Sequence, residues 1–568
     1  MILAVILGAV FSIFNSLSLC ELCKRFPSKT SYYDILYENV GEAFAYMIAW
    51  LKLSQNLFMV ALITVTVGNY IYYVADAPSH ISWLPPHKRW AEIELDTLVF
   101  SLAFLVLVSG VVAVGLPLSS GYVISLFWVN VTAFMFMLVL LLVYAGSFKW
   151  LSRESFQPFE FMGTLEGAAL SVFFYSNLDE IVEMSTQFKT TNSLAAISLC
   201  AGLLSVLTYY FSAIVFVASS LPLDKISAVA TVPKIFSYTT FYDSKYVLSS
   251  IAFLVFILTA MRAYVNAQRS CNLLTDDGLI HRSVSSVKQT HPLFVLFIAL
   301  LSIPLFVWIS VASLIEGFCA SSLIMTILIN ATLISVQYQP QEKPENGNSV
   351  FPSWKATKSL LVRLVLCCGC LAHRKILSKL GISEDSEPTT ETSKLVNWAI
   401  IFYIPSALAL AIALVYGIPA IDQDKWFVVG VLIYLMVVIL FNFCVLATEP
   451  RVKSVHYDNG IMASFIPLFN ISLSCVLLVT IRWKAFIPVG GWTLIGILVY
   501  FFYGFKHSNE ANFNQGHHYV ETPPGRVKFH SSPQLGTKVK RIQPDNFVDQ
   551  TSPSWSSDEE KNFDFPQK

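Results

Sequence analysis

Apolar runs of about 20 residues dominate this sequence, and that is the length a helix needs to cross the hydrocarbon core of a bilayer. A helix satisfies its own backbone hydrogen bonds, so such runs predict a bundle of spanning helices. The expected fold is an all-α, multi-pass membrane protein with about 13 transmembrane helices. The runs lie near residues 2 to 22, 42 to 74, 97 to 114, 120 to 145, 164 to 187, 193 to 219, 247 to 268, 292 to 312, 315 to 337, 396 to 416, 427 to 448, 461 to 480 and 488 to 505.

The composition supports this expectation. Hydrophobic residues make up 55% of the 568 residues and charged residues only 13%, whereas a soluble domain carries about 25% charged residues. Lys plus Arg and Asp plus Glu both number 37, so the formal net charge is zero. These values exclude an ordinary soluble enzyme, a disordered scaffold and a nucleic-acid partner, and they make the positions of the charges informative.

The loops between the runs predict the organisation of the chain. Lys and Arg gather in alternate loops, which places the N-terminus outside and the C-terminus in the cytoplasm. Residues 354 to 380 are basic, lack acids and contain many Leu and Val, as in a helix on an anionic leaflet. We therefore expect a nine-helix core over 1–337, a cytoplasmic linker with a basic interfacial helix over 338–395, four further helices over 396–505 and a disordered cytoplasmic tail over 506–568.

The densest set of acids inside an apolar run is Asp179, Glu180 and Glu183. Ionisable groups within spanning helices are costly, so they mark candidate functional sites. On a continuous helix these three residues lie near one another on one side, where they could hold a cation. The alternative is that they lie at the cytoplasmic end of the helix in solvent.

Lys52 is the other charged residue in an unexpected place. It lies about ten residues after the expected helix start at Glu42, or about 15 Å along the axis. A lysine there should pair with a carboxylate or line a wet cavity, with Asp179 and Glu183 as the obvious partners. If the helix starts later, Lys52 reaches the interface instead.

The sequence contains no pattern that predicts catalysis. We find no glycine-rich phosphate loop, no spacing of His and Cys typical of a metal site and no nucleophile with a nearby base. The prediction is a protein that is not an enzyme, with no catalytic residues, no metal site and no cofactor. Of the remaining charges, Glu21, Arg262 and Arg269 are expected at helix ends, and Glu316 in the turn before its helix.

Several segments together resemble the cationic amino acid transporters, a family of the amino acid, polyamine and organocation (APC) superfamily. Their order and spacing cover residues 1 to about 510. Cys20 to Pro27 and Val40-Gly41-Glu42 are similar to the family's second helix and the loop after it. Gly163 to Lys189 are similar to its sixth helix, and Asp276 to Leu279 also resemble the family. Phe465 to Pro467, Trp492, Gly496 and Tyr503-Gly504 are similar to its last two helices.

The resemblance implies an inverted-repeat, LeuT-like bundle that holds substrate at mid-membrane between interrupted first and sixth helices. It implies substrate binding by Tyr175, Ser176 and Asn177, with Asp179 and Glu183 providing negative charge. Two departures are evident: the sequence begins at the equivalent of the family's second helix, so its first helix is lacking, and Asn177 replaces a glycine of the break.

Two functions are expected from this resemblance. The first is secondary transport of amino acids, cationic ones such as lysine and arginine, by alternating access across the plasma membrane, or the lysosomal membrane as the alternative. The second is a non-transporting relative that acts as an amino acid sensor or as a partner subunit, with Lys52 as a tethered cation in place of a substrate side chain. The expected partners are a small amino acid and the lipid bilayer, and no nucleic acid.

Overall fold

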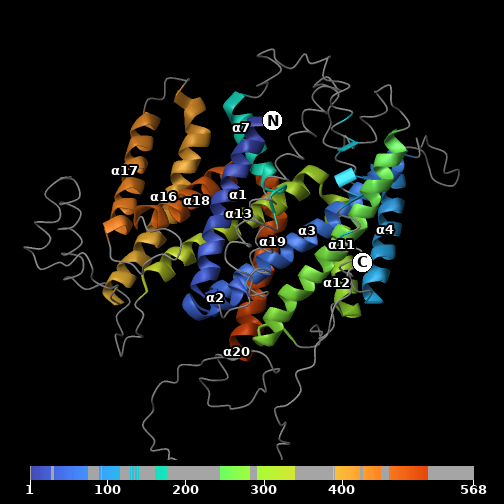
Figure 1. Ribbon diagram of the computed structural model, residues 1–568, viewed down its shortest axis with the longest axis horizontal. Coiled ribbons are helices and arrows are strands. Elements are labelled where there is room, and N and C mark those ends of the chain that lie inside the picture. The colour runs from blue at the N-terminus through green and yellow to red at the C-terminus, as the bar shows by residue number, and fades with distance from the viewer. Residues whose placement is uncertain are drawn as a thin grey trace, which may run out of the picture. The chain divides into compact units, whose positions relative to one another are not determined.

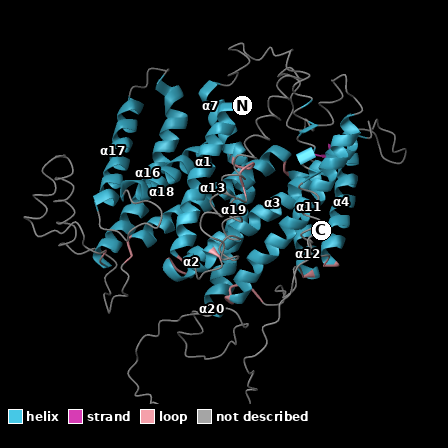
Figure 2. Cartoon of the chain, in the orientation of Figure 1, coloured by secondary structure: helices cyan, strands magenta, loops and turns pink. Residues whose placement is uncertain are grey.

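In the computed structural model of the protein, the described residues are almost entirely helical (Figures 1 and 2). The structure describes residues 2–26, 31–74, 89–90, 93–115, 160–176, 244–281, 291–339, 388, 390–421, 427–448 and 460–508, with scattered positions between 124 and 139. These residues belong to the unit Met1–Gly516, and the unit His517–Lys568 lies outside them.

The elements follow one another along the chain as helices with one small hairpin. The hairpin pairs two strands of two residues each, antiparallel, just before α4. The elements are α1 (Ile2–Arg25), α2 (Tyr32–Asn39), α3 (Glu42–Val74), β1 (Arg89–Trp90), β2 (Ile93–Glu94), α4 (Leu95–Ala113), α7 (Glu160–Ser171), α11 (Ser244–Asp276), α12 (Pro292–Trp308), α13 (Val311–Gln337), α16 (Thr390–Ile421), α17 (Phe427–Thr448), α18 (Gly460–Thr480), the 3-10 turn η4 (Trp483–Ala485), α19 (Phe486–Val499), the π-helical turn η5 (Tyr500–Gly504) and α20 (Phe505–His507).

Seven of the described segments are long and apolar enough to cross a bilayer. They are Leu3–Leu22, Glu42–Tyr72, Ser249–Asp276, Val311–Gln337, Thr390–Gly417, Phe427–Leu446 and Trp483–His507. Three shorter apolar helices, in α4, α12 and α18, coincide with further predicted runs. The expectation of an all-α, multi-pass membrane protein is confirmed. The runs near 120 to 145 and 193 to 219 fall mostly or wholly outside the described residues.

Helix α3 is the central helix of the described bundle. It packs against α4, α11, α12 and α13, and 94% of its apolar window is buried. By contrast, only 17% of the corresponding window of α17 is buried, so most of that helix is available to lipid. Figure 1 shows α3 in blue crossing the region of α11 and α13.

The short helix α2 ties one end of α3 to the end of α11. Gly41 has a φ of 126°, which only glycine adopts without strain, and this residue turns the chain from α2 into α3. The Tyr33 hydroxyl donates a hydrogen bond of 2.8 Å to Asp277, just after α11. Burial and the Asp277 carboxylate raise the pKa of Tyr33 well above its ordinary value, so the hydroxyl remains a donor at physiological pH.

Helices α1 and α7 approach each other through small residues. A Cβ added at Gly8 would overlap the Ser171 hydroxyl, and one added at Gly167 would lie 2.9 Å from the Ala4 Cβ. The Ser171 hydroxyl also donates to the Ala4 carbonyl, at 3.3 Å. Close backbone packing of this kind is the usual way in which membrane helices associate, because lipid supplies no hydrophobic drive between them.

The last spanning helix, α19, is joined to α3 by two tryptophans. Trp50 Nε1 donates to the Trp492 carbonyl at 2.9 Å, and Trp492 Nε1 donates to the Trp50 carbonyl at 3.1 Å. The two indoles stack with ring centroids 4.8 Å apart. Tyr46 adds a hydrogen bond to the Gly496 carbonyl at 2.9 Å. This contact requires a glycine at 496, since a Cβ there would overlap the Trp50 indole.

We predict that Gly496→Ala destabilises the protein. The added methyl group must displace the Trp50 ring, which is buried and hydrogen-bonded, so the free energy of unfolding should fall by about 1–3 kcal/mol. Thermal melting of the detergent-solubilised protein measures this change. The matched control is Gly490→Ala on the same helix, where a Cβ meets nothing within 4 Å. Equal melting temperatures for the two variants would contradict the proposed packing.

Candidate functional site

Helix α7 ends inside the bundle. Its 12 residues span only about 18 Å, less than the roughly 30 Å of a bilayer core. After Ser171 the backbone tightens: the N–H groups of Phe173, Phe174, Tyr175 and Ser176 each bond the carbonyl three residues earlier, at 3.0–3.3 Å. The described part of the segment thus leaves the α-helix five residues before Asn177, where the sequence places the break.

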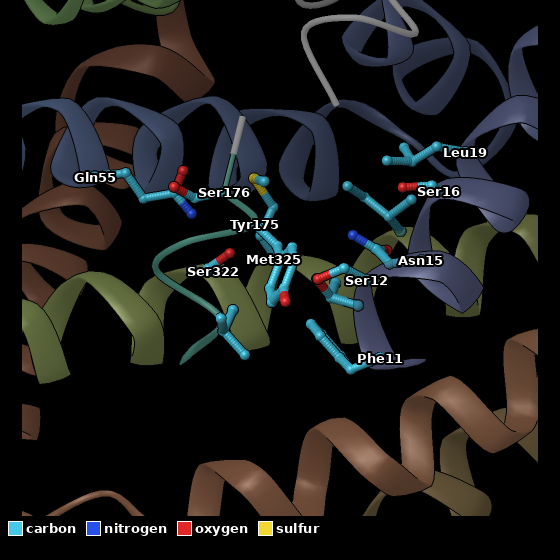
Figure 3. Close-up of a pocket in the computed structure, with 13 residues that line it drawn as sticks. Phe11, Ser12, Asn15, Ser16, Leu19, Gln55, Tyr175, Ser176, Ser322 and Met325 are labelled. Carbon is cyan, nitrogen blue, oxygen red and sulfur yellow. The ribbon is translucent and has the colours of Figure 1, made fainter. Parts of the chain in front are cut away.

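A small polar cavity lies between this turn and the helices α1, α3 and α13 (Figure 3). Its volume is about 30 Å³. Apolar side chains, among them Phe11, Leu19 and Met325, form part of its wall. No described residue that lines the cavity is charged. The polar lining residues carry hydroxyls and amides, and they are Ser12, Asn15, Ser16, Gln55, Tyr175, Ser176, Ser322 and Thr326.

The structure brings two of the predicted site residues to this cavity. Tyr175 donates from its hydroxyl to the Val5 carbonyl on α1 at 3.2 Å, and Ser176 donates to the Phe173 carbonyl at 2.7 Å. Asn177, Asp179 and Glu183 lie outside the described residues, so their proposed roles stay predictions. The turn that carries Tyr175 and Ser176 leads directly to them along the chain.

Lys52 lies on α3, and its predicted role as a charge partner stays a prediction. Helix α3 begins at Glu42, so the later start that would bring Lys52 to the interface is not found. The lysine is 7% exposed, and its carbonyl accepts a hydrogen bond from the Asn56 side chain at 2.8 Å. Lys52 is one helical turn from Gln55, which lines the cavity.

Sequence reasoning missed most of the lining residues. Ser12, Asn15 and Ser16 on α1, and Ser322 and Thr326 on α13, are uncharged residues in apolar runs. Such residues are common in apolar runs and do not carry the cost that makes a charged residue there a candidate site. A signal does exist in the sequence, because on α1 the three residues recur at spacings of three and four and therefore share one face of the helix.

A second group of charges joins α7 and α13 to the turn before α19. Arg482 lies 3.2 Å from Glu166 on α7 and 3.6 Å from Glu316 on α13. The sequence predicts Glu316 in a turn, but α13 starts at Val311, so Glu316 lies within the helix and is only 3% exposed. The Ser310 hydroxyl, which accepts from the Ser313 N–H at 3.2 Å, caps the helix and explains this early start.

Comparison with known proteins identifies the family. Residues 1–374 match the family model described as amino acid permease, and residues 463–508 match the model of its C-terminus. The chain belongs to the amino acid permease family. The first match includes α1, α3 and α13 and the turn after α7, which line the cavity, and the second includes most of α18 together with α19 and η5.

Individual relatives of this permease are distant in sequence but similar over most of its length. Cationic amino acid transporter 4 of Mus musculus is 23% identical, with 93% of this chain and 86% of the relative covered. Its namesake in Homo sapiens is 20% identical, with 92% and 85% covered. The vacuolar cationic amino acid transporter 2 of Arabidopsis thaliana is 22% identical, with 87% and 81% covered. The suspected relation to cationic amino acid transporters is confirmed.

We predict that Arg482→Ala destabilises the permease because it removes a positive charge beside the buried Glu316. Arg482 is 65% exposed, and an ion pair with an exposed partner contributes up to about 1 kcal/mol, so the melting temperature should fall slightly. Adding Glu316→Gln removes the buried charge and should restore part of the loss. If the double variant melts no higher than Arg482→Ala alone, Glu316 is not the residue that depends on Arg482.

Proposed function

We propose that the protein is a secondary transporter of amino acids, specifically of cationic ones such as lysine and arginine, that works by alternating access. The observation that carries this proposal is the end of α7 inside the bundle, beside a polar cavity. The C-terminal end of a helix carries partial negative charge, which favours a substrate ammonium group. The names of the relatives, all cationic amino acid transporters, support the substrate class.

The proposed roles of the site residues follow from their places along the chain. Tyr175 and Ser176 line the cavity and would hold the main-chain end of the substrate. Asn177 would continue the break. Asp179 and Glu183, two and six residues further on, would supply negative charge for the cationic side chain. Enzymatic activity is not proposed, because the family is one of transporters.

The membrane and the orientation are also proposals. The family makes this an integral membrane protein, and we propose the plasma membrane, with the lysosomal membrane as the alternative. The relatives do not agree on one compartment, since one is named vacuolar and another, cationic amino acid transporter 3 of Arabidopsis thaliana, mitochondrial. The outside N-terminus, the cytoplasmic C-terminus and the domain boundaries at 337, 395 and 505 stay predictions from the sequence.

Uptake into reconstituted vesicles tests the transport function. We expect saturable uptake of labelled arginine, and a decrease of at least about tenfold for Asp179→Asn, since about 1.4 kcal/mol of lost charge interaction gives a factor of ten. The control is Glu391→Gln, which changes a partly exposed acid paired with Lys394 on α16. Wild-type uptake no greater than that of protein-free vesicles would refute transport, whereas equal uptake by wild type and Asp179→Asn would refute only the role of Asp179.

The alternative function, a non-transporting sensor or partner subunit, is favoured by one observation. Lys52 is a buried cationic residue of α3, three residues before Gln55, which lines the cavity. There it could occupy the position of a substrate's positive charge and keep free amino acids out. A protein of this kind would bind or signal without moving substrate across the membrane.

Replacing Lys52 separates the two functions. If Lys52 is a tethered cation, Lys52→Ala should create arginine binding that the wild type lacks, or should lower the melting temperature by leaving a carboxylate without its counter-charge. Equilibrium binding and thermal melting in detergent measure the two effects. Lys394→Ala, on the surface of α16, is the control. A Lys52→Ala protein that binds and melts like the wild type would rule out the tethered cation.

A further inference from the structure

The strongest unassigned feature of the molecule is the side chain of Gln55. It projects from the central helix α3 and is 3% exposed. Its amide nitrogen, Nε2, is buried and has no hydrogen-bond partner among the described residues. The same side chain lines the cavity beside the end of α7. In Figure 3, Gln55 and Ser176 lie on one side of this cavity, and Ser12, Asn15 and Ser16 on the other.

A buried donor without a hydrogen-bond partner destabilises the folded protein, unless a bound molecule accepts its hydrogen bond. Two neighbouring hydroxyls already donate elsewhere, that of Tyr175 to Val5 and that of Ser176 to Phe173. The cavity of about 30 Å³ has room for about two water-sized groups. It therefore has room for one terminal polar group of a ligand.

The direction of the hydrogen bond decides which group this is. A cationic amino acid carries an α-ammonium group, a cationic side chain and an α-carboxylate. The ammonium and guanidinium groups only donate hydrogen bonds, and the carboxylate only accepts them. Because Gln55 Nε2 can only donate, the carboxylate is the part of such a substrate that suits this atom, whereas a cationic group would suit only the Gln55 Oε1 acceptor. The absence of acids among the described lining residues removes a source of repulsion for this group.

We propose that Gln55 donates a hydrogen bond to the α-carboxylate of the transported amino acid and so makes the protein select substrates that have this group. The proposal rests on the proposed transport function and extends it to a specificity residue. Tyr175 and Ser176, in the turn after α7, line the same cavity as Gln55, so a carboxylate bound at Gln55 lies beside the turn to which the substrate site is assigned.

A pair of ligands tests the proposal: arginine and agmatine, which is arginine without its carboxylate. Dissociation constants are measured with purified protein by competition against labelled arginine. Gln55→Glu keeps the size and acceptor oxygen of the side chain but replaces its donor by a negative charge. We expect the preference for arginine over agmatine to fall at least about tenfold, the size of one hydrogen bond to a charged group. Gln55→Leu, which removes the donor without adding charge, should give a smaller fall.

The matched control is Asn56→Leu. Asn56 is the neighbouring buried amide on the same helix, but its nitrogen already donates to the Lys52 carbonyl at 2.8 Å and it does not line the cavity. This variant should keep the wild-type preference. Melting temperatures establish which variants fold, and Gln55→Leu carries the test if Gln55→Glu does not fold.

Failure of this inference differs from failure of the transport function. If the wild type binds arginine and the Gln55 variants keep its preference for arginine over agmatine, Gln55 does not contact the carboxylate and the inference is overturned. Equal losses of affinity for arginine and agmatine would also overturn the inference, because Gln55 would then contact another part of the substrate or have a purely structural role. If the wild type neither binds nor transports arginine, the proposed substrate class itself is wrong.

Discussion

The bilayer offers no hydrogen bonds, and this constraint governs the arrangement around α3. Each polar group on the most buried helix of the described bundle must find a partner within the protein. Trp50 exchanges hydrogen bonds with Trp492, Ser54 lies 3.3 Å from Ser321 on α13, and Asn56 bonds its own helix. Gln55 differs from these neighbours because its nitrogen has no partner among the described residues, and its side chain lines a cavity.

Helix α13 connects this central region to the C-terminal helices. One side of it belongs to the hydrophobic core built on α3, through residues such as Phe318 and Leu323. Further along, Ile327, Ile334 and Tyr338 belong to a second core formed with α16, α17 and α18. A displacement of α13 would thus change the packing of both cores, because closely packed interiors transmit strain.

The sequence allowed the spanning helices to be predicted well, because apolar runs of bilayer length leave few alternatives. The window 42 to 74 coincides with α3, and 427 to 448 with α17. The helix α2 was not predicted, since eight residues with a mixed pattern carry little signal, and its position depends on the distant contact between Tyr33 and Asp277.

The candidate site could be predicted only in part. The resemblance led to Tyr175 and Ser176, and counting residues from Glu42 placed Lys52. Gln55 and the serines of α1 were missed, because an uncharged polar residue in an apolar run is usually satisfied by a neighbouring helix and only the fold reveals the exception. The early start of α13, and with it the burial of Glu316, depends on a local cap and an arginine more than 160 residues away.

The close approach of α1 and α7 at Gly8 and Gly167 has a mechanical consequence. Because the two helices approach so closely at these glycines, we expect α1 and α7 to move together. Described residues of α1, α3 and α13, and of the turn after α7, line the cavity. If α1 and α7 move together, a path for solute into the cavity would open between them and α3 or α13, where Met325 lies.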